Sequence, residues 1–152
     1  IETGQVIPAI IAIGKPAEPR FISGIMRRIV NADHRKAPET LFFKEDLKTP
    51  YPLKKDDPIS ESLKMVRLAP SADNFQPWRI RVRQDRIDFY LKASKILSSL
   101  IKSLKLQYLD IGIAICHFDL MQKAQKQEGI WKILNRQNAD SSYQYIASWI
   151  PA

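Results

Sequence analysis

Two prolines, Pro70 and Pro77, enclose a short polar segment that constrains the fold more than any other feature of the sequence. Proline fixes its own φ and disfavours helical geometry in the residue before it, so a helix that precedes the segment must end just before Pro70. Ser71, Asn74 and Gln76 lie between the prolines and offer uncharged donors and acceptors. We therefore expect a rigid polar loop, either a helix-to-strand connection capped by Asn and Ser side chains or a binding loop.

A helical pattern precedes this loop. Asp57 and Pro58 are typical of a helix start, with an N-cap carboxylate followed by proline at the first helical position. Ile59, Leu63 and Val66 then recur at helical spacing. These residues predict an amphipathic helix whose apolar stripe packs in the core and whose end delivers the loop.

A strand pattern follows the loop, because apolar and polar residues alternate there. The apolar positions are Trp78, Ile80, Val82, Ile87, Phe89 and Leu91. Such alternation predicts a hairpin with one buried face. On the other face we expect Arg79, Arg81 and Arg83 to face solvent and pair with Asp88, with an anion-binding row as the alternative.

Further elements are expected on both sides of this unit. Apolar runs predict strands at Val6 to Ile13, Trp131 to Leu134 and Tyr143 to Trp149, and helices at Phe21 to Asn31, Lys92 to Lys105 and Ile111 to about Gln127. Asp110 is the candidate N-cap of the last helix, whose first half is apolar nearly all round, so we expect that helix to be central and buried. The segment from Ala37 to Pro58 predicts an extended arm whose Phe42 or Phe43 docks on the core or on another subunit.

Composition excludes several classes of protein. The 152 residues are enough for one core and one domain, and no run of eighteen apolar residues predicts a membrane span. The single Cys116 excludes an internal disulfide and fits a reducing cytoplasm, while His34 and His117 lack metal-ligand spacing. Neither a dinucleotide-binding glycine motif nor a phosphate-binding P-loop is present.

The net charge is the one compositional feature that invites a nucleic-acid interpretation. The chain carries a formal charge of +8 and has a sequence pI near 9.7. Its basic residues are spread among many acids, and no helix-turn-helix, zinc-finger or RNA-binding pattern organises them. We therefore expect a solvated basic surface and no nucleic-acid partner.

The loop also carries a specific pattern, Ala-Pro-Ser-x-x-Asn-x-Gln-Pro-Trp, from Ala69 to Trp78. This pattern resembles the flavin-contacting loop of the nitroreductase superfamily. Two further segments, residues 6–16 and 109–114, support the resemblance, and the first is similar to the strand that ends nitroreductase domains. Its position before the loop resembles a nitroreductase subfamily with rearranged or tandem-fused halves. The chain accordingly resembles the C-terminal portion of such a protein, a single domain over residues 1–152 that lacks the family's N-terminal part.

The resemblance implies a fold, a cofactor and a partner. The fold is α+β, with a mainly antiparallel sheet packed with helices around a central buried helix, and incomplete. The implied activity is FMN-dependent hydride transfer from NAD(P)H, through the flavin, to a small electrophilic acceptor. The implied assembly is a homodimer, or association with the missing N-terminal half, in the cytoplasm. A non-catalytic binding or assembly domain that retains the fold is the alternative.

The resemblance also implies which residues bind the cofactor, and it requires no catalytic side chain because the chemistry takes place on the flavin. The implied cofactor-binding residues are Arg35, Lys36, Pro70, Ser71, Ala72 and Asn74. Arg35 and Lys36 match a basic segment that binds the flavin phosphate in the family. Because Ala37 separates this pair from Pro38, either of the two could make the phosphate contact. Gln76 and Trp78 are expected to hold the loop.

Overall fold

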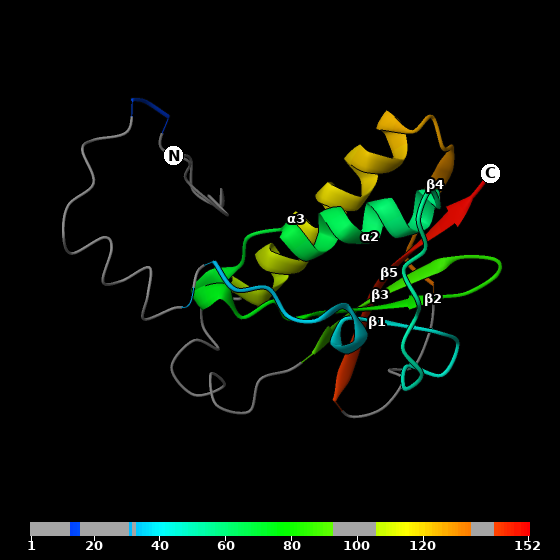
Figure 1. The fold of residues 1–152 in the computed structure, drawn as a ribbon, viewed down its shortest axis with the longest axis horizontal. Helices are drawn as coiled ribbons and strands as arrows, with labels where there is room; N and C mark the ends of the chain where they lie inside the picture. The colour runs from blue at the N-terminus through cyan, green and yellow to red at the C-terminus, as the bar shows by residue number, and fades with distance from the viewer. Residues whose placement is uncertain (1–12, 16–30, 32, 93–105, 135–141) are drawn as a thin grey trace, which may run out of the picture.

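A computed structural model describes residues 13–15, 31, 33–92, 106–134 and 142–152. Within this part of the chain, strands form a mixed sheet in the order β1-β2-β3-β5-β4, and the helices α2 and α3 pack together on one face of it (Figure 1). The elements are β1 (Phe42–Phe43), α2 (Pro58–Leu68), β2 (Trp78–Val82), β3 (Ile87–Lys92), α3 (Leu106–Ala124), β4 (Gly129–Lys132) and β5 (Tyr143–Pro151), with 3-10 turns at Pro38–Thr40 and Ala72–Asn74. The expected α+β fold is confirmed. The elements expected at 6–13, 21–31 and 92–105 lie outside the described residues except at single end positions, and Lys92, the expected first residue of a helix, is the last residue of β3.

The predicted hairpin is present. β2 and β3 pair antiparallel from Trp78 opposite Leu91 to Val82 opposite Ile87, and β5 pairs antiparallel with the other edge of β3. The apolar residues of β2 and β3 belong to the core that both helices cover, and Phe89 meets Phe118 of α3 edge to face at 5.4 Å. The alternating apolar positions therefore lie on the side of the hairpin that faces the helices, as the sequence predicts.

The arm before α2 docks on this sheet, as expected. Phe42 is fully buried, and β1 pairs parallel with β2 through Phe42 opposite Ile80. The helix start is also confirmed, because Asp57 caps α2 by accepting a hydrogen bond from the Ser60 N–H at 2.9 Å. The Gln122 side chain donates to the Ser62 hydroxyl at 3.1 Å and joins α3 to α2.

The expectations for α3 require correction. The helix begins at Leu106, so Asp110 lies inside it and is not its N-cap, and the helix ends at Ala124 before Gln127. Only one side of α3 is buried, while Leu109 and Leu120 are 38% and 60% exposed. The physical reason is the layering: the sheet and α2 cover one side of α3, so the opposite side has no described layer to pack against.

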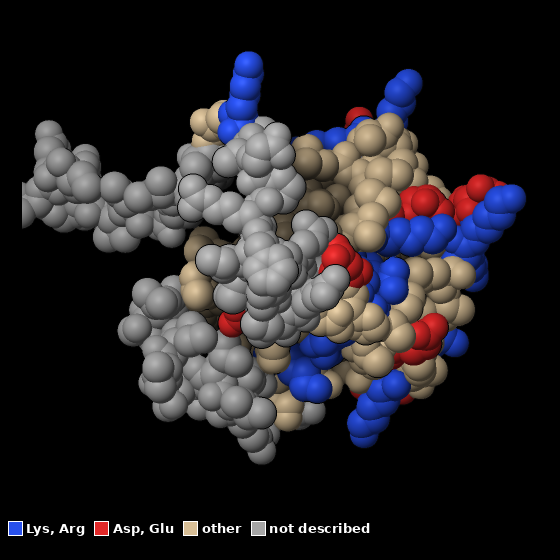
Figure 2. All heavy atoms as spheres, turned by 60° about the vertical axis from the view of Figure 1, so that its left-hand side comes forward, with Lys and Arg blue, Asp and Glu red and all other residues tan. Residues whose placement is uncertain are grey.

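The expectation of solvent-facing arginines on β2 is also wrong. Arg79 is 6% exposed and the Arg81 side chain is 12% exposed, because the arm beyond β1 covers this face of the sheet with Phe43 and Leu47. The expected pairing is confirmed, since Arg81 Nη2 lies 2.7 Å from Asp88 Oδ2. Elsewhere on the visible surface, basic side chains are interspersed with acidic ones (Figure 2).

Candidate functional site

The loop between α2 and β2 has an unusual backbone. Asp73, Asn74 and Gln76 have φ values of 48°, 52° and 50°, which place them in the left-handed region. This region costs residues with a Cβ about 1 kcal/mol each, although Asp and Asn tolerate it better than most. Such a conformation persists only where surrounding contacts impose it. The contacts that hold this loop therefore matter.

Gln76 provides most of those contacts and holds the loop from within, as expected. Its side chain is 1% exposed. The Nε2 group donates to His34 O at 3.3 Å and to Asn74 Oδ1 at 3.0 Å, and Oε1 accepts from the Lys36 N–H at 2.9 Å. The Gln76 N–H in turn donates to the Ser71 hydroxyl oxygen at 2.9 Å. A single buried amide thus ties both ends of the loop to residues 34–36.

Asn74 connects the loop to the same basic segment. Its Nδ2 group donates to Asn31 O at 2.6 Å and to His34 O at 2.8 Å. Its Oδ1 accepts from Arg35 Nη1 at 3.1 Å. Both ends of the amide are therefore engaged within the chain, and they bring together two segments that lie about forty residues apart in sequence.

Arg35 and Lys36 reach this loop in different directions. Arg35 donates to the Asn74 amide and, at 3.4 Å, to Leu68 O at the end of α2. Lys36 Nζ instead donates to Phe75 O at 2.5 Å and lies 4.8 Å from the centre of the Phe75 ring. Burial, followed by the charges of Arg79 and Lys92, lowers the pKa of Lys36 to about 8. The two basic residues are therefore not equivalent.

The beginning of the loop is the accessible part. Pro70 is exposed, and Ser71 and Ala72 are half-buried. The Ser71 oxygen accepts from Gln76, and no described residue receives its hydroxyl proton, so this O–H can donate to a ligand. The implied site residues are thus gathered around one loop: Pro70, Ser71 and Ala72 form its accessible beginning, and Arg35 and Lys36 contact it at Asn74 and Phe75.

Asp110 belongs to this site, although the sequence pattern suggested a different role for it. Its Oδ1 accepts the Ala72 N–H at 2.9 Å, and the residue is 4% exposed. Burial raises its pKa, assisted by the nearby Asp73 charge, against the opposing effect of the Ala72 hydrogen bond. The sequence contained one indication of this role: a carboxylate within an otherwise apolar half of a helix becomes buried and therefore needs a hydrogen-bond partner outside that helix.

The described part of the chain offers neither a metal-ligand cluster nor a membrane-spanning helix. No group of three or more His, Cys, Asp or Glu residues there could hold a metal ion. No helix there combines the length and apolar character needed to cross a bilayer.

Comparison with known families identifies the chain. The family model described as Putative TM nitroreductase matches residues 1–122, which contain the loop, the Arg35 and Lys36 segment, and Asp110. Comparisons with the curated proteins and with the solved structures found no match. The match spans most of the 152 residues and supports a general oxidoreductase role. The chain belongs to the Putative TM nitroreductase family.

Proposed function

We propose that this chain is an FMN-dependent oxidoreductase domain of the nitroreductase type that transfers hydride from NAD(P)H, through the flavin, to a small electrophilic acceptor. The observation that carries the proposal is the loop with left-handed residues at Asp73, Asn74 and Gln76. Strained backbone is concentrated at functional sites, where binding requires a fixed shape that relaxed geometry does not provide. Here the strain falls inside the segment that resembles a flavin-contacting loop.

The residues of the loop fit a flat, polar ring system with an anionic tail. Pro70, Ser71 and Ala72 present an apolar ring, a free hydroxyl donor and a half-exposed backbone toward a ligand. Arg35 and Lys36 provide positive charge for a phosphate group. In this proposal Asn74 contributes by holding Arg35 against the loop.

When bound, the flavin supplies the hydride chemistry, so the protein needs no acid–base pair of its own. The chain binds and orients the ring. Asp110 fixes the backbone of Ala72 from α3, and Gln76 fixes the other end of the loop. These two buried side chains act on the position of the loop, because neither is exposed to a ligand.

We further propose that residues 1–152 act as one domain in the cytoplasm and that a second protein surface completes the pocket. That surface is a second copy of the chain or the N-terminal half of the family fold. The exposed apolar residues Leu109 and Leu120 on α3 support an interface there.

The visible absorption spectrum tests the cofactor. The purified chain is mixed with FMN, desalted and scanned, and we expect flavin bands to remain. We expect Asn74→Ala to weaken FMN affinity by about tenfold, since loss of hydrogen bonds worth about 1 to 2 kcal/mol frees Arg35 from the loop. Gln84→Ala, an exposed amide change in the hairpin turn, is the matched control and should retain wild-type affinity.

The alternative is a non-catalytic binding or assembly domain. It is favoured by the internal use of both ends of the Asn74 amide, which is also what a purely structural motif requires. A colourless protein that retains no flavin after desalting would support this alternative and reject the flavoprotein proposal. Retained flavin makes NADH or NADPH oxidation with a nitroaromatic acceptor the next assay.

A further inference from the structure

A cavity of about 320 Å³ lies where α2 begins and where the hairpin turns from β2 to β3. Its wall includes Ile59 from α2, Val82 and Ile87 from the hairpin, and Trp149 from β5, all within the described part of the chain. A volume of about 300 Å³ is the lower end of the range for small-molecule sites in proteins. The cavity is therefore large enough for a ligand with a single aromatic ring.

The floor of the cavity is apolar. Val82, Ile87 and Trp149 are buried and belong to the core, and Ile59 packs against that core. The Trp149 ring meets the Phe118 ring edge to face at 5.5 Å, which fixes its orientation. A fixed indole ring among branched aliphatic side chains favours a flat aromatic ligand, because aromatic pairs attract each other beyond the area that they bury.

The rim of the cavity carries a guanidinium with unused donors. Arg83 lines the cavity, and among the described residues its side chain donates no hydrogen bond. Glu45 Oε2 lies 2.9 Å from the buried Arg83 Nε and Asp85 Oδ1 lies 3.8 Å from it, but neither oxygen accepts a hydrogen bond from this atom. A guanidinium has five N–H donors in a planar fork, and a donor left unsatisfied away from water is unfavourable. An acceptor atom on a ligand in the cavity would use this fork.

The charges at this end of the hairpin already balance. Three arginines lie within ion-pair distance of three carboxylates: Arg81 and Arg86 with Asp88, Arg86 with Asp85, and Arg83 with Glu45. A charged ligand would add an uncompensated charge beside them, whereas an uncharged carbonyl oxygen accepts a hydrogen bond and adds no charge. Gln84 and Gln127, which also line the cavity, are uncharged as well. The cavity therefore favours a neutral ligand.

We propose that this cavity binds a small uncharged aromatic compound that carries a carbonyl group. The ring of the ligand lies on the apolar floor beside Trp149, and its carbonyl oxygen accepts from the Arg83 guanidinium. A hydrogen bond from a charged donor is stronger than one between neutral groups, so Arg83 fixes the orientation of the ring in the cavity.

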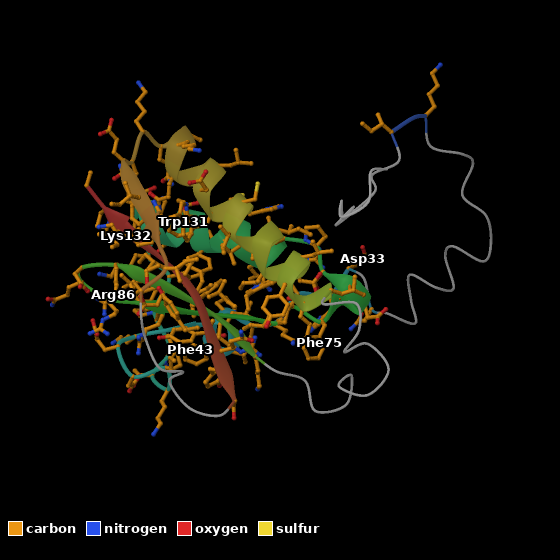
Figure 3. All side chains as sticks on the ribbon, turned by 180° about the vertical axis from the view of Figure 1, so that it is seen from behind. Asp33, Phe43, Phe75, Arg86, Trp131 and Lys132 are labelled. Atoms are coloured by element: carbon orange, nitrogen blue, oxygen red, sulfur yellow. The ribbon has the colours of Figure 1, made fainter. Side chains whose placement is uncertain are left out.

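The cavity is separate from the loop between α2 and β2. Ile59 lies at the start of α2 and Leu68 at its end, so about 14 Å of helix separates the cavity from the loop. Figure 3 shows Arg86, which lines the cavity, and Phe75 of the loop toward opposite ends of the sheet. None of the implied cofactor-binding residues lines the cavity. The proposal therefore does not rest on the proposed flavin chemistry and is tested on flavin-free protein.

Titration of benzamide into the flavin-free full chain tests the site, followed by the tryptophan indole N–H signals in proton–nitrogen NMR spectra. Trp149 lines the cavity, whereas Trp78 follows the loop at the start of β2. The variants Trp149→Phe and Trp78→Phe assign the two signals. We expect the Trp149 signal to shift until the site is saturated, because the ligand ring lies beside the indole, and the Trp78 signal to stay in place.

Two comparisons test the assigned contacts. Arg83→Gln should raise the benzamide Kd by about tenfold, through loss of a charge-assisted hydrogen bond. Lys123→Gln is the matched control, because Lys123 is exposed, pairs with Asp119 on α3 and does not line the cavity, and its benzamide Kd should equal that of the wild type. Benzoate has the same ring and a charged group, so its Kd for the wild type should be several-fold higher than that of benzamide.

Several outcomes would overturn the proposal. They are a Trp149 signal that does not shift, equal shifts of the Trp149 and Trp78 signals, equal affinities of Arg83→Gln and Lys123→Gln, and tighter binding of benzoate than of benzamide. Ile59→Phe adds volume to the wall and should weaken benzamide binding, so this variant decides the outcome even if Arg83→Gln fails to fold. An unchanged benzamide Kd in Ile59→Phe would place the ligand outside the cavity.

Discussion

Two arginines on the same strand have opposite surroundings. Arg79 and Arg81 lie two residues apart on β2, on the face away from the helices, and both are largely buried. Arg81 pairs with Asp88 at 2.7 Å, whereas among the described residues Arg79 bonds to the carbonyl groups of Gln76 and Trp78 and to no carboxylate. The difference teaches that burial alone does not define the role of a charged residue. Arg81 has a carboxylate partner across the hairpin, whereas Arg79 is compensated by backbone carbonyl groups.

The Arg81 end of the hairpin is a closed network. Asp88 is fully buried, accepts from the Ser148 hydroxyl at 2.5 Å, and lies 3.0 Å from Arg86 Nε. Burial acts to raise the pKa of Asp88, but Ser148, Arg81 and Arg86 together outweigh it and hold that pKa below its usual value. Each charged group at this end is therefore compensated within the chain.

The largest expected effect is at the carboxylate of this network. Asp88→Ala should lower the free energy of unfolding by about 3 to 5 kcal/mol at pH 7, because it removes the carboxylate that pairs with both Arg81 and Arg86 and leaves Arg81 without a counter-ion among the described residues. Urea denaturation measures this free energy. Asp85→Ala, which removes an exposed ion pair, is the control and should lower the free energy of unfolding by less than about 1 kcal/mol. Since the pKa is lowered by folding, the contribution of Asp88 is present at neutral pH and lost as pH falls through the folded pKa. Equal effects of the two variants would contradict the closed network.

The second prediction tests the comparison directly. Arg81→Gln should destabilise the protein by about 2 kcal/mol, since Asp88 loses a charged hydrogen bond while Arg86 remains. Arg79→Gln should change stability by less than about 1 kcal/mol without a ligand, because it removes a buried charge together with its two carbonyl contacts. Chemical denaturation of both variants in phosphate-free buffer decides this. A larger loss from Arg79→Gln would assign Arg79 to the fold.

A smaller effect on stability is expected at Asp110, the buried carboxylate of α3 that holds the beginning of the loop. Asp110 binds the Ala72 N–H instead of a cation, so Asp110→Ala should cost about 1 to 2 kcal/mol through the unsatisfied amide. Asp110→Asn retains the acceptor oxygen and should be at least as stable as the wild type at pH 7. Folding raises the pKa of Asp110, so the contribution of this carboxyl group to the free energy of unfolding is lost as pH rises through the folded pKa. The amide introduced by Asp110→Asn does not titrate, so the difference in stability between this variant and the wild type should increase with pH. Thermal unfolding from pH 4 to pH 8 measures the difference in unfolding temperature between the two proteins. A difference that decreases as pH rises would refute the prediction.

The smallest expected effect is the pH dependence at Lys36. Folding lowers its pKa from 10.5 to about 8, so the unfolded chain binds more protons between these values and stability should rise with pH across that window. Lys36→Met should remove this part of the slope, while Lys132→Gln should leave it unchanged. Urea midpoints at pH 7.5 and pH 9.5 provide the measurement. A wild-type slope that survives in Lys36→Met would mean that another group titrates there.

Local patterns predicted the elements well where the contacts that form them are close in sequence. The Asp57 and Pro58 helix start needs only Ser60, and the hairpin needs only apolar alternation across a short turn. Helix α3 was less predictable, because the side of a helix that becomes buried depends on which layers cover it. Its apolar residues lie on both sides, so the sequence did not reveal that Leu109 and Leu120 remain exposed.

By itself, the sequence determined the family and the rigid loop between two prolines, because these depend on chain stiffness and a local pattern. Only the tertiary structure decided that Asp110 holds Ala72 and that Lys36 contacts Phe75. The hydrogen bonds of Lys36 to Phe75 and of Ala72 to Asp110 join residues that are 39 and 38 positions apart. Charge pairing across such distances is set by how strands and helices pack, which the order of residues along the chain does not display.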